Sequence, residues 1–506
     1  MQLIELPTEI LHLILFYAVS NRGAKRALRL RVVCKTFRRG LYPALFETHI
    51  LDDRCGPCGN AVGSKDWQFR HQHGADKLWQ RYLSYRVLIE GSQNTLPGPF
   101  TQIRQFAEIP QVAHTICQEQ EHTLDLNVTV EELCRLTTLH GTVMTRDMFK
   151  WWHTWLKGPA PPAGLTATAL LSAAAHFDLL PLAIRLLDEG FSPVGHNYVF
   201  APPIQVAAHA GNIAMLELFR SRLSKTTFEP FSVIGAAIRG DLEVIKIIMQ
   251  QSDDTGPLRL GCVSHSSDTG QAIIHARSYT SVPEVFDYLT SYLDLTASPQ
   301  RLLFWHNDLR DHAGLGNTEM IRHLLRLGVP VQQKDQGLES PLRMACENGH
   351  NDVVDLLLEY GADPNFEAQK SNPAYPLHNS GMAGNLRLTQ RLLDAGATIN
   401  LPQPENQYTT IMPILWWAFA REHTALIRLL IDRGASLQEV SGSSLTSLRR
   451  KQAADSVCGM VYTLGLESMA ELLREYGFNI DASRKKCAKT GQFWHRWAEA
   501  KAVLEL

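Results

Sequence analysis

Apolar and polar residues recur along most of this chain in the pattern of short amphipathic helices arranged in pairs. The most regular pair lies at 340–363, where residues 341–348 form a short first helix that Gly349 ends. Apolar residues at 353–358 give the second helix a broad apolar face. Gly361 follows, where glycine takes the left-handed conformation without steric cost. The pattern therefore predicts one complete helix–turn–helix unit.

Related helix pairs recur over residues 166–480. Their starts fall at Ala169, Pro202, Phe231, Gln271, Asn307, Ser340, Tyr375, Met412 and Ser456. Glycines twelve residues apart mark the turn and the end of the second helix at Gly316/Gly328, Gly349/Gly361, Gly384/Gly396 and Gly465/Gly477. The units at 271 and 412 lack the first glycine, so we expect them to be distorted, and the unit at 456 to be a C-terminal cap. The period predicts about six to nine stacked helix pairs.

The best units resemble the ankyrin repeat. Ser340-Pro341-Leu342 and the small Ala345 match the opening of that repeat, as does Tyr375-Pro376-Leu377-His378, and the family's period is roughly 33 residues. The resemblance implies an all-α ankyrin-repeat solenoid in which each pair buries its apolar stripe against its neighbours. It also implies that the array binds a protein target through its first helices and projecting turns.

The turn tips are the candidate target-binding positions, because exposed aromatic and long polar side chains make effective interface anchors. The candidates are Tyr198, Phe200, Lys334, Asp335, Phe366, Glu367, Lys370, Glu405 and Tyr408. The alternative for each is a solvated loop residue without a partner. The polar insertion at 250–270 predicts a flexible loop.

Residues 1–50 predict a small helical module. Leu6-Pro7 precedes a helix that carries Ile10, Leu11, Ile14 and Leu15 on an apolar face. Residues 21–23 predict a break, and a second helical stretch follows at 27–37. A module of this size buries little on its own and usually completes its core on a partner.

Two runs in this module resemble an F-box: L-P-x-E-I-L at 6–11 and R-x-V-C-K-x-F at 31–37. The resemblance implies docking onto the Skp-type adaptor of a cullin–RING ubiquitin ligase. Carried over residue by residue, the adaptor-binding set is Leu6, Pro7, Ile10, Leu11, Val33, Cys34 and Phe37. The alternative is an ordinary helical hairpin packed against residues 51–165.

Eight basic residues and no acidic residue lie between Arg22 and Arg39. A solvated helix face is the favoured interpretation, with an acidic partner, nucleic acid or a nuclear signal as alternatives. Aromatic residues do not interleave with these charges as they do in single-strand binding, so nucleic acid is not an expected partner.

Residues 51–165 form a connecting region without the repeat. Helices are expected at 77–88, 131–139 and 146–156, and a semi-rigid linker at 158–164. Trp151, Trp152 and Trp155 favour a helix packed on the first repeat over a cofactor site. The last region, 481–506, carries Phe493, Trp494 and Trp497 and favours a capping helix, with a partner-binding helix as the alternative.

One possible metal site lies in the connecting region. Cys55, Cys58, His71 and His73 offer two thiolates and two imidazoles, a ligand set that suits zinc. The close spacing of the histidines differs from the usual zinc finger, and Gly56-Pro57 also makes a plain turn. A loop is favoured, and no metal or cofactor is expected.

Composition narrows the class of protein. In 506 residues, 49 Lys and Arg against 51 Asp and Glu give a net charge of −2, which names no partner. Nine scattered cysteines favour reduced thiols and hence a cytoplasmic or nuclear location. The apolar run at 10–19 is too short to cross a bilayer, and Glu5 and Glu9 do not suit a signal peptide.

The sequence holds no motif of catalysis: no phosphate-binding loop, nucleophile elbow, H-E-x-x-H or strand-led G-x-G-x-x-G. No catalytic residue is therefore expected. The leading hypothesis is the substrate-recognition subunit of a Skp–cullin–F-box ubiquitin ligase, whose repeats bind the target. The alternative is an ankyrin scaffold with no link to ubiquitin.

Overall fold

The computed structural model describes residues 7–27, 34–48, 75–90, 104–120, 124–141, 165–195, 197, 199–223, 230–250, 261, 263–264, 267–293, 301–332, 340–366, 375–400, 414–420, 422–435, 461 and 467–477. Regular structure in these residues is helical, apart from an isolated bridge between Val263 and Leu293. The contacts divide the chain into two compact units, Met1–Phe16 with Tyr42–Phe304, and Tyr17–Leu41 with Trp305–Leu506. No helix of the described residues is long and apolar enough to cross a membrane.

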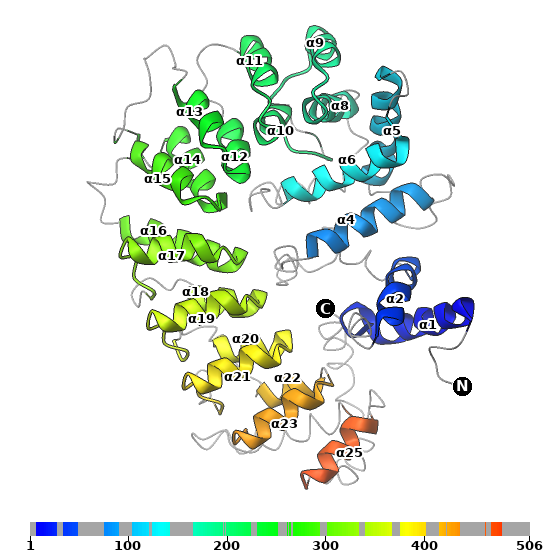
Figure 1. Ribbon diagram of the computed structural model, residues 1–506, viewed down its shortest axis with the longest axis vertical. Coiled ribbons are helices and arrows are strands. Elements are labelled where there is room, and N and C mark those ends of the chain that lie inside the picture. The colour runs from blue at the N-terminus through cyan, green and yellow to red at the C-terminus, as the bar shows by residue number, and fades with distance from the viewer. Residues whose placement is uncertain are drawn as a thin grey trace, which may run out of the picture. The chain divides into compact units, whose positions relative to one another are not determined.

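The N-terminal module consists of α1 (Thr8–Ala27) and α2 (Lys35–Glu47), drawn in blue in Figure 1. Leu15 of α1 and Leu45 of α2 are fully buried. His12 Nε2 lies 2.7 Å from Glu47 Oε2 and joins the two helices. The predicted break at 21–23 is wrong, because α1 runs through it; an interior glycine costs a helix only about 1 kcal/mol.

Three α-helices and a π-helix make up the described part of the connecting region: α4 (Ala75–Tyr85), η4 (Arg86–Glu90), α5 (Arg104–Glu119) and α6 (Leu126–Gly141). The sequence predicted counterparts of α4 and α6 but missed α5, where Pro110 stands inside the helix. Ile109 and Ile116 of α5 are fully buried, which explains why it forms. The predicted helix at 146–156, the linker at 158–164 and the tail at 481–506 lie outside the described residues.

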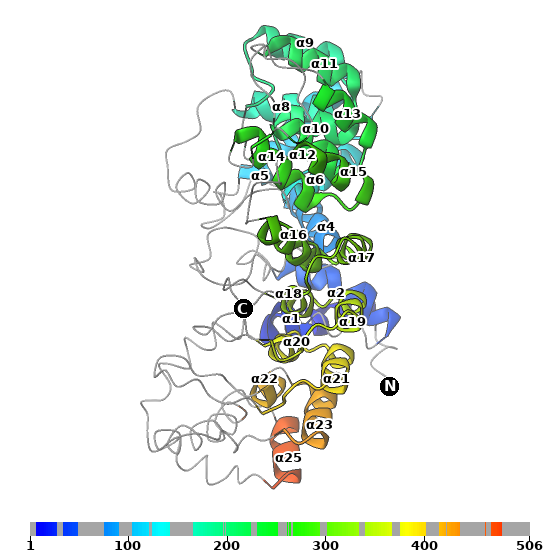
Figure 2. The ribbon, with the colours of Figure 1, turned by 90° about the vertical axis from the view of Figure 1, so that its left-hand side faces the viewer.

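Helix pairs of the first unit follow α6. They are α8 (Leu165–His176) with α9 (Leu180–Asp188), α10 (Pro203–Ala210) with α11 (Ile213–Arg222), α12 (Pro230–Arg239) with α13 (Leu242–Gln250), and α14 (Asp268–Tyr279) with α15 (Pro283–Tyr292). The first helices pack side by side, α8 on α10, α10 on α12 and α12 on α14 (Figure 2). Gly235 permits this approach, because a Cβ there would overlap the carbonyl oxygen of Gln205.

Helix pairs continue in the second unit. They are α16 (Arg301–Leu315) with α17 (Thr318–Arg326), α18 (Pro341–Asn348) with α19 (Asn351–Glu359), α20 (Pro376–Ala383) with α21 (Leu386–Asp394), and α22 (Ile414–Ala420) with α23 (Thr424–Asp432), followed by α25 (Glu467–Glu475). Among the first helices, α18 packs on α20, and α20 on α22. The expectation of an all-α solenoid of stacked helix pairs is confirmed.

Side-chain amides join successive turns in the second unit. Gln332 Nε2 donates to Asp363 O at 3.1 Å, and Asn365 Nδ2 donates to Gly396 O at 2.9 Å. Asn400 Nδ2 donates to Gly434 O at 2.8 Å. Each of these amides follows by four residues a glycine that ends a second helix, so the repeat itself places the bridging group.

Backbone hydrogen bonds hold the later part of the insertion at 250–270 against the end of α15. Gly261 N donates to Ser291 O at 2.7 Å, and Val263 N donates to Tyr292 O at 2.9 Å. Val263 is buried beside the end of α15. For these residues the expectation of a flexible loop is wrong, because their backbone donors are used by the neighbouring repeat.

Candidate docking face on the first helix

Helix α1 is apolar on two opposite faces. Leu11, Leu15 and Val19 recur every four residues and are buried in the module. A helix that is apolar all round is normally covered all round. In α1 the second apolar face is exposed in the part of the chain that the structure describes.

The open face consists of Ile10, Leu13, Ile14 and Tyr17, and we name it the α1 face. The four residues expose 44%, 50%, 36% and 62% of their surface, respectively. Their spacing brings them together on one side of the helix, because residues three, four and seven apart lie above one another. Exposed apolar side chains gathered on one helix face are candidates for protein–protein contact.

The expected adaptor-binding residues that the structure describes do not share one surface. Ile10 belongs to the α1 face, and Pro7 is exposed just before α1 begins. Leu11 and Phe37 are buried at 5% and 8% exposure, so their expected role as surface contacts is corrected. They hold the module together, because each lies on the buried side of its helix.

Cys34 is half-buried and its sulfur accepts a hydrogen bond from Phe37 N at 3.4 Å, an interaction within the turn before α2. Leu6 and Val33 lie outside the described residues. Leu13 and Tyr17 were not among the residues predicted from the sequence, although their spacing of three and seven residues from Ile10 places them on the same helix face.

Two expected target-binding aromatics are buried. Phe200 is 1% exposed, and Asn197 Oδ1 closes its turn by accepting from Val199 N and Phe200 N at 3.0 and 2.6 Å. Phe366 is 8% exposed, and its N donates to Asp363 O at 3.1 Å. Both rings fill the space beneath a turn, which corrects the expectation that they project from it.

The remaining target-binding candidates lie outside the described residues. They are Tyr198, Lys334, Asp335, Glu367, Lys370, Glu405 and Tyr408. The same holds for Cys55, Cys58, His71 and His73. Among the residues that are described, no group of three or more His, Cys, Asp or Glu side chains is placed to hold a metal ion.

Three titratable groups in the described helices have pKa values that are shifted towards the uncharged form, as packing in a protein interior favours. Burial raises the pKa of the Cys134 thiol to about 12 and also raises that of Cys346. Both thiols are therefore protonated near neutral pH and weakly nucleophilic. Burial, together with nearby Arg239, lowers the pKa of His209 to about 4, which keeps that imidazole neutral.

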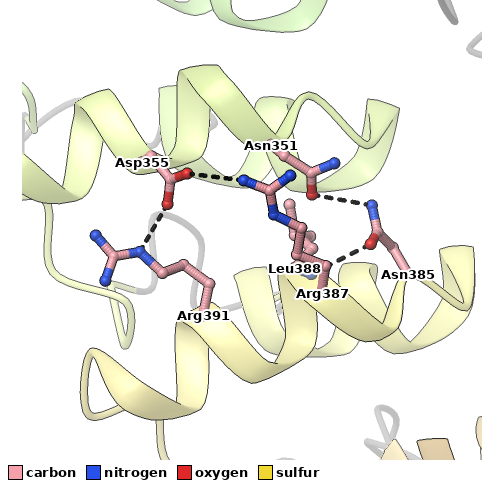
Figure 3. A network of polar contacts seen from close by, with 6 residues as sticks. All are labelled: Asn351, Asp355, Asn385, Arg387, Leu388 and Arg391. Carbon is pink, nitrogen blue, oxygen red and sulfur yellow. Dashed lines mark hydrogen bonds and ion pairs between the residues drawn. The ribbon is translucent and has the colours of Figure 1, made fainter. Parts of the chain in front are cut away.

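Charged groups on the second helices connect neighbouring repeats. Figure 3 shows Asp355 of α19 between two arginines of α21, at 2.6 Å from Arg391 and 3.9 Å from Arg387. Beside them, Asn385 Nδ2 donates to Asn351 Oδ1 at 3.2 Å. These ion pairs and this hydrogen bond connect one repeat to the next, so they help to fix how the two repeats are aligned.

Known proteins match the repeats. The family described as "Ankyrin repeats (3 copies)" matches residues 312–368. Ankyrin repeat and SOCS box protein 16 of Homo sapiens is 35% identical over 96 residues, which cover 19% of this chain and 20% of that protein. Inactive serine/threonine-protein kinase TEX14 of Mus musculus is 32% identical over 93 residues, 18% of this chain and 6% of that one.

A plant protein matches a longer stretch. E3 ubiquitin-protein ligase KEG of Arabidopsis thaliana is 26% identical over 195 residues, 35% of this chain and 11% of that protein. The chain therefore spans a fifth or less of each of these three relatives. The matches identify ankyrin repeats at residues 312–368, and the stacked helix pairs and turn glycines agree with them. Ankyrin repeats point to a role in protein–protein interaction.

Proposed function

We propose that this chain is the substrate-recognition subunit of a Skp–cullin–F-box ubiquitin ligase. The α1 face docks on the Skp-type adaptor, and the ankyrin repeats hold the target protein. The chain itself does no chemistry; it brings the target close to the ubiquitin-carrying partner and orients it. Such a subunit works in the cytoplasm or the nucleus.

The observation that carries this proposal is the exposure of the α1 face. It lies on the helix that begins directly after the Leu6-Pro7 pair of the F-box-like run. Four large apolar side chains on one helix face form a compact set of anchors, and a few anchors supply most of the binding energy of a protein interface. The name of the plant relative, a ubiquitin-protein ligase, is in keeping with this role but belongs to that protein.

The target site is proposed at the turns between repeats. Tyr198, Lys334, Asp335, Glu367, Lys370, Glu405 and Tyr408 stay the candidate contacts. Long polar and aromatic groups at solenoid turns fit a folded protein surface as the partner. Phe200 and Phe366 are removed from this set by their burial.

Co-purification with a recombinant Skp-type adaptor tests the docking. The parent chain is expected to retain the adaptor, and Ile10→Asp with Tyr17→Asp to lose it, because two charges would then have to be buried in the interface. Leu6→Ala with Pro7→Ala is expected to weaken retention. Ile184→Asp with Ile213→Asp is the matched control, since these residues of α9 and α11 are similarly exposed at 41% and 40%.

Failure of the parent chain to bind any Skp-type adaptor would overturn the ligase role. An ankyrin scaffold without a link to ubiquitin would then be the function left by the repeats. Retention by the Ile10→Asp, Tyr17→Asp chain would leave the ligase role but move the docking site away from the α1 face.

A further inference from the structure

Positive charge on the repeat helices is carried almost entirely by arginine. The residues between 165 and 477 that the structure describes include fifteen arginines and one lysine, Lys246. Lysine is common elsewhere in the chain, because residues 1–164 hold six lysines and residues 478–506 hold four lysines against two arginines. The strong preference for arginine therefore belongs to the repeat helices and not to the sequence as a whole.

Ion pairs between repeats account for only part of this preference. Asp355 of α19 lies 2.6 Å from Arg391 and 3.9 Å from Arg387 (Figure 3). Arginine suits such contacts, because its planar guanidinium matches the shape of a carboxylate. Arg326 of α17, however, is exposed and has no ion pair with a described residue. The shape of the guanidinium is not needed there, and lysine would carry the same charge.

The single described lysine of the repeats is held within its own helix. Lys246 Nζ lies 2.7 Å from Glu243 Oε1, one turn earlier in α13. Further lysines of the array lie outside the described residues, and they are Lys225, Lys334, Lys370 and Lys451. Lys334 and Lys370 belong to the proposed target site, where a bound target would cover them. An unpaired primary amine is therefore rare on the described surface of the repeat helices.

Lysine and arginine differ in the reaction that a ubiquitin ligase promotes. The neutral amine of a lysine attacks the thioester that joins the terminal carboxyl group of ubiquitin to its carrier enzyme. A C–N bond forms, the C–S bond breaks, and the amine proton passes to the departing thiolate. Arginine does not accept ubiquitin in this way, because its guanidinium stays protonated at physiological pH. Since proximity drives the transfer, a lysine beside the target would compete with the lysines of the target.

From this distribution we infer that the described repeat helices hold a target protein without accepting ubiquitin themselves. Arginine supplies the positive charge of their surface and the contacts between repeats, and amines that would divert ubiquitin from the target are almost excluded. This role rests on the proposed function, because the choice between lysine and arginine matters in this way only to a chain held beside a ubiquitin carrier.

Self-ubiquitination of a chain with added lysines tests this role. The full chain is assembled with a Skp-type adaptor, a cullin–RING core, ubiquitin and its activating and conjugating enzymes, and the modified lysines are mapped by mass spectrometry. Arg326→Lys with Arg387→Lys adds two exposed amines and keeps both positive charges. This chain is expected to carry ubiquitin at both introduced lysines, and about fivefold or more ubiquitin on the repeat helices than the parent chain.

Arg326→Gln with Arg387→Gln is the matched control, because it changes the same two positions and offers no primary amine. It is expected to carry no more ubiquitin on the repeat helices than the parent chain. Retention of the adaptor is measured separately for all three chains, so that failure to assemble is not mistaken for protection.

Introduced lysines that stay unmodified in a chain that retains the adaptor would overturn the protective role and leave the proposed function standing. Ubiquitin on Lys246 of the parent chain, at the level of the introduced lysines, would equally overturn it, because the repeat helices would then accept ubiquitin as they are. A parent chain that does not retain the adaptor sinks the proposed function, and the protective role with it, so the adaptor measurement tells the two failures apart.

Discussion

At the scale of single residues, turn glycines of one repeat serve two different purposes. Gly316 and Gly328 both have left-handed backbones, with φ of +78° and +83°. A Cβ at 316 would lie 2.6 Å from His350 Nδ1, whereas one at 328 would meet nothing within 4 Å. Gly316 therefore provides both a backbone conformation and space for a neighbour, and Gly328 provides the conformation alone.

This difference predicts unequal costs for the same substitution. Gly328→Ala is expected to lower the free energy of unfolding by about 1–2 kcal/mol, the cost of a left-handed alanine. Gly316→Ala should cost clearly more, because His350, whose Nε2 lies 2.9 Å from Gly314 O, would have to move. Urea unfolding of the two variants compares them, and equal losses would show that His350 is not held in place.

His209 predicts a dependence of stability on pH. Its pKa is lowered by burial to about 4, below the ordinary value of 6.5, so the unfolded chain binds more protons between these values. Stability is therefore complete above about pH 6.5 and falls as the pH falls towards 4. The lowered pKa of His176 acts in the same direction.

The measurement is the urea midpoint at pH 7.5 and at pH 5. The parent chain should lose stability on acidification, and His209→Gln should lose less, because glutamine takes up no proton. His114→Gln, at an exposed position of α5, is the control. An identical loss in the parent and the His209→Gln chain would contradict the assignment.

At the scale of helices and turns, bridging amides and ion pairs both join repeats but differ in strength. Asn365 uses both ends of its amide, donating to Gly396 O at 2.9 Å and accepting from Thr398 N at 2.7 Å. The Asp355–Arg391 pair of Figure 3 is a surface contact, with the arginine side chain 46% exposed. Salt and water weaken such a pair.

Asn365→Ala is accordingly expected to cost about 1–3 kcal/mol, because two backbone groups lose their partner. Asp355→Ala should cost about 0–1 kcal/mol and less in high salt. Chemical denaturation in low and high salt measures both. A larger effect of Asp355→Ala than of Asn365→Ala would contradict this ranking.

The two faces of α1 predict opposite phenotypes. Leu13→Ala, on the α1 face and 50% exposed, should leave the unfolding free energy nearly unchanged and weaken adaptor binding about tenfold or more, as truncation of an interface anchor does. Leu15→Ala, at 0% exposure, should cost about 2–5 kcal/mol of stability through the cavity it leaves. Calorimetry of binding and of unfolding separates the effects, and a stability loss in Leu13→Ala without weaker binding would show that the face is structural.

At this scale, helices could be predicted from the sequence wherever a short pattern of residues repeats along the chain. Glycine spacing and apolar runs located the helix pairs, including those at 271 and 412 that lack the turn glycine. In the 412 unit Glu422 takes the left-handed conformation instead, with φ of 56°, and in the 271 unit Thr280 ends α14 in an extended conformation. A non-glycine residue can replace glycine there when packing on both sides supports the turn.

Predictions from the sequence were incomplete or wrong where contacts between distant residues determine the structure. No helix was predicted at α5; Pro110 inside it removes a backbone hydrogen bond, but the buried face of the helix outweighs that cost. Phe200 and Phe366 stand in polar turns and look exposed in sequence, but each turn folds over its ring. In α1 the sequence shows that both faces are apolar, but only the burial of each residue tells which face is exposed.

At the scale of the whole molecule, the helix pairs of each compact unit stack so that each repeat depends on its neighbours. An array of this kind is suited to binding other molecules. The N-terminal 141 residues do not follow the repeat pattern. Within them lies the α1 face, which we propose as the docking surface. We therefore expect this face, and not the array, to bind the ligase.

Amide hydrogen exchange of the full chain, alone and with saturating Skp-type adaptor, tests this expectation. Exchange should slow in residues 8–17 on adding the adaptor and stay unchanged in the repeats α8 to α23, and the Ile10→Asp, Tyr17→Asp chain should show no slowing. Unchanged exchange in residues 8–17, or slowing confined to the repeats, would contradict it.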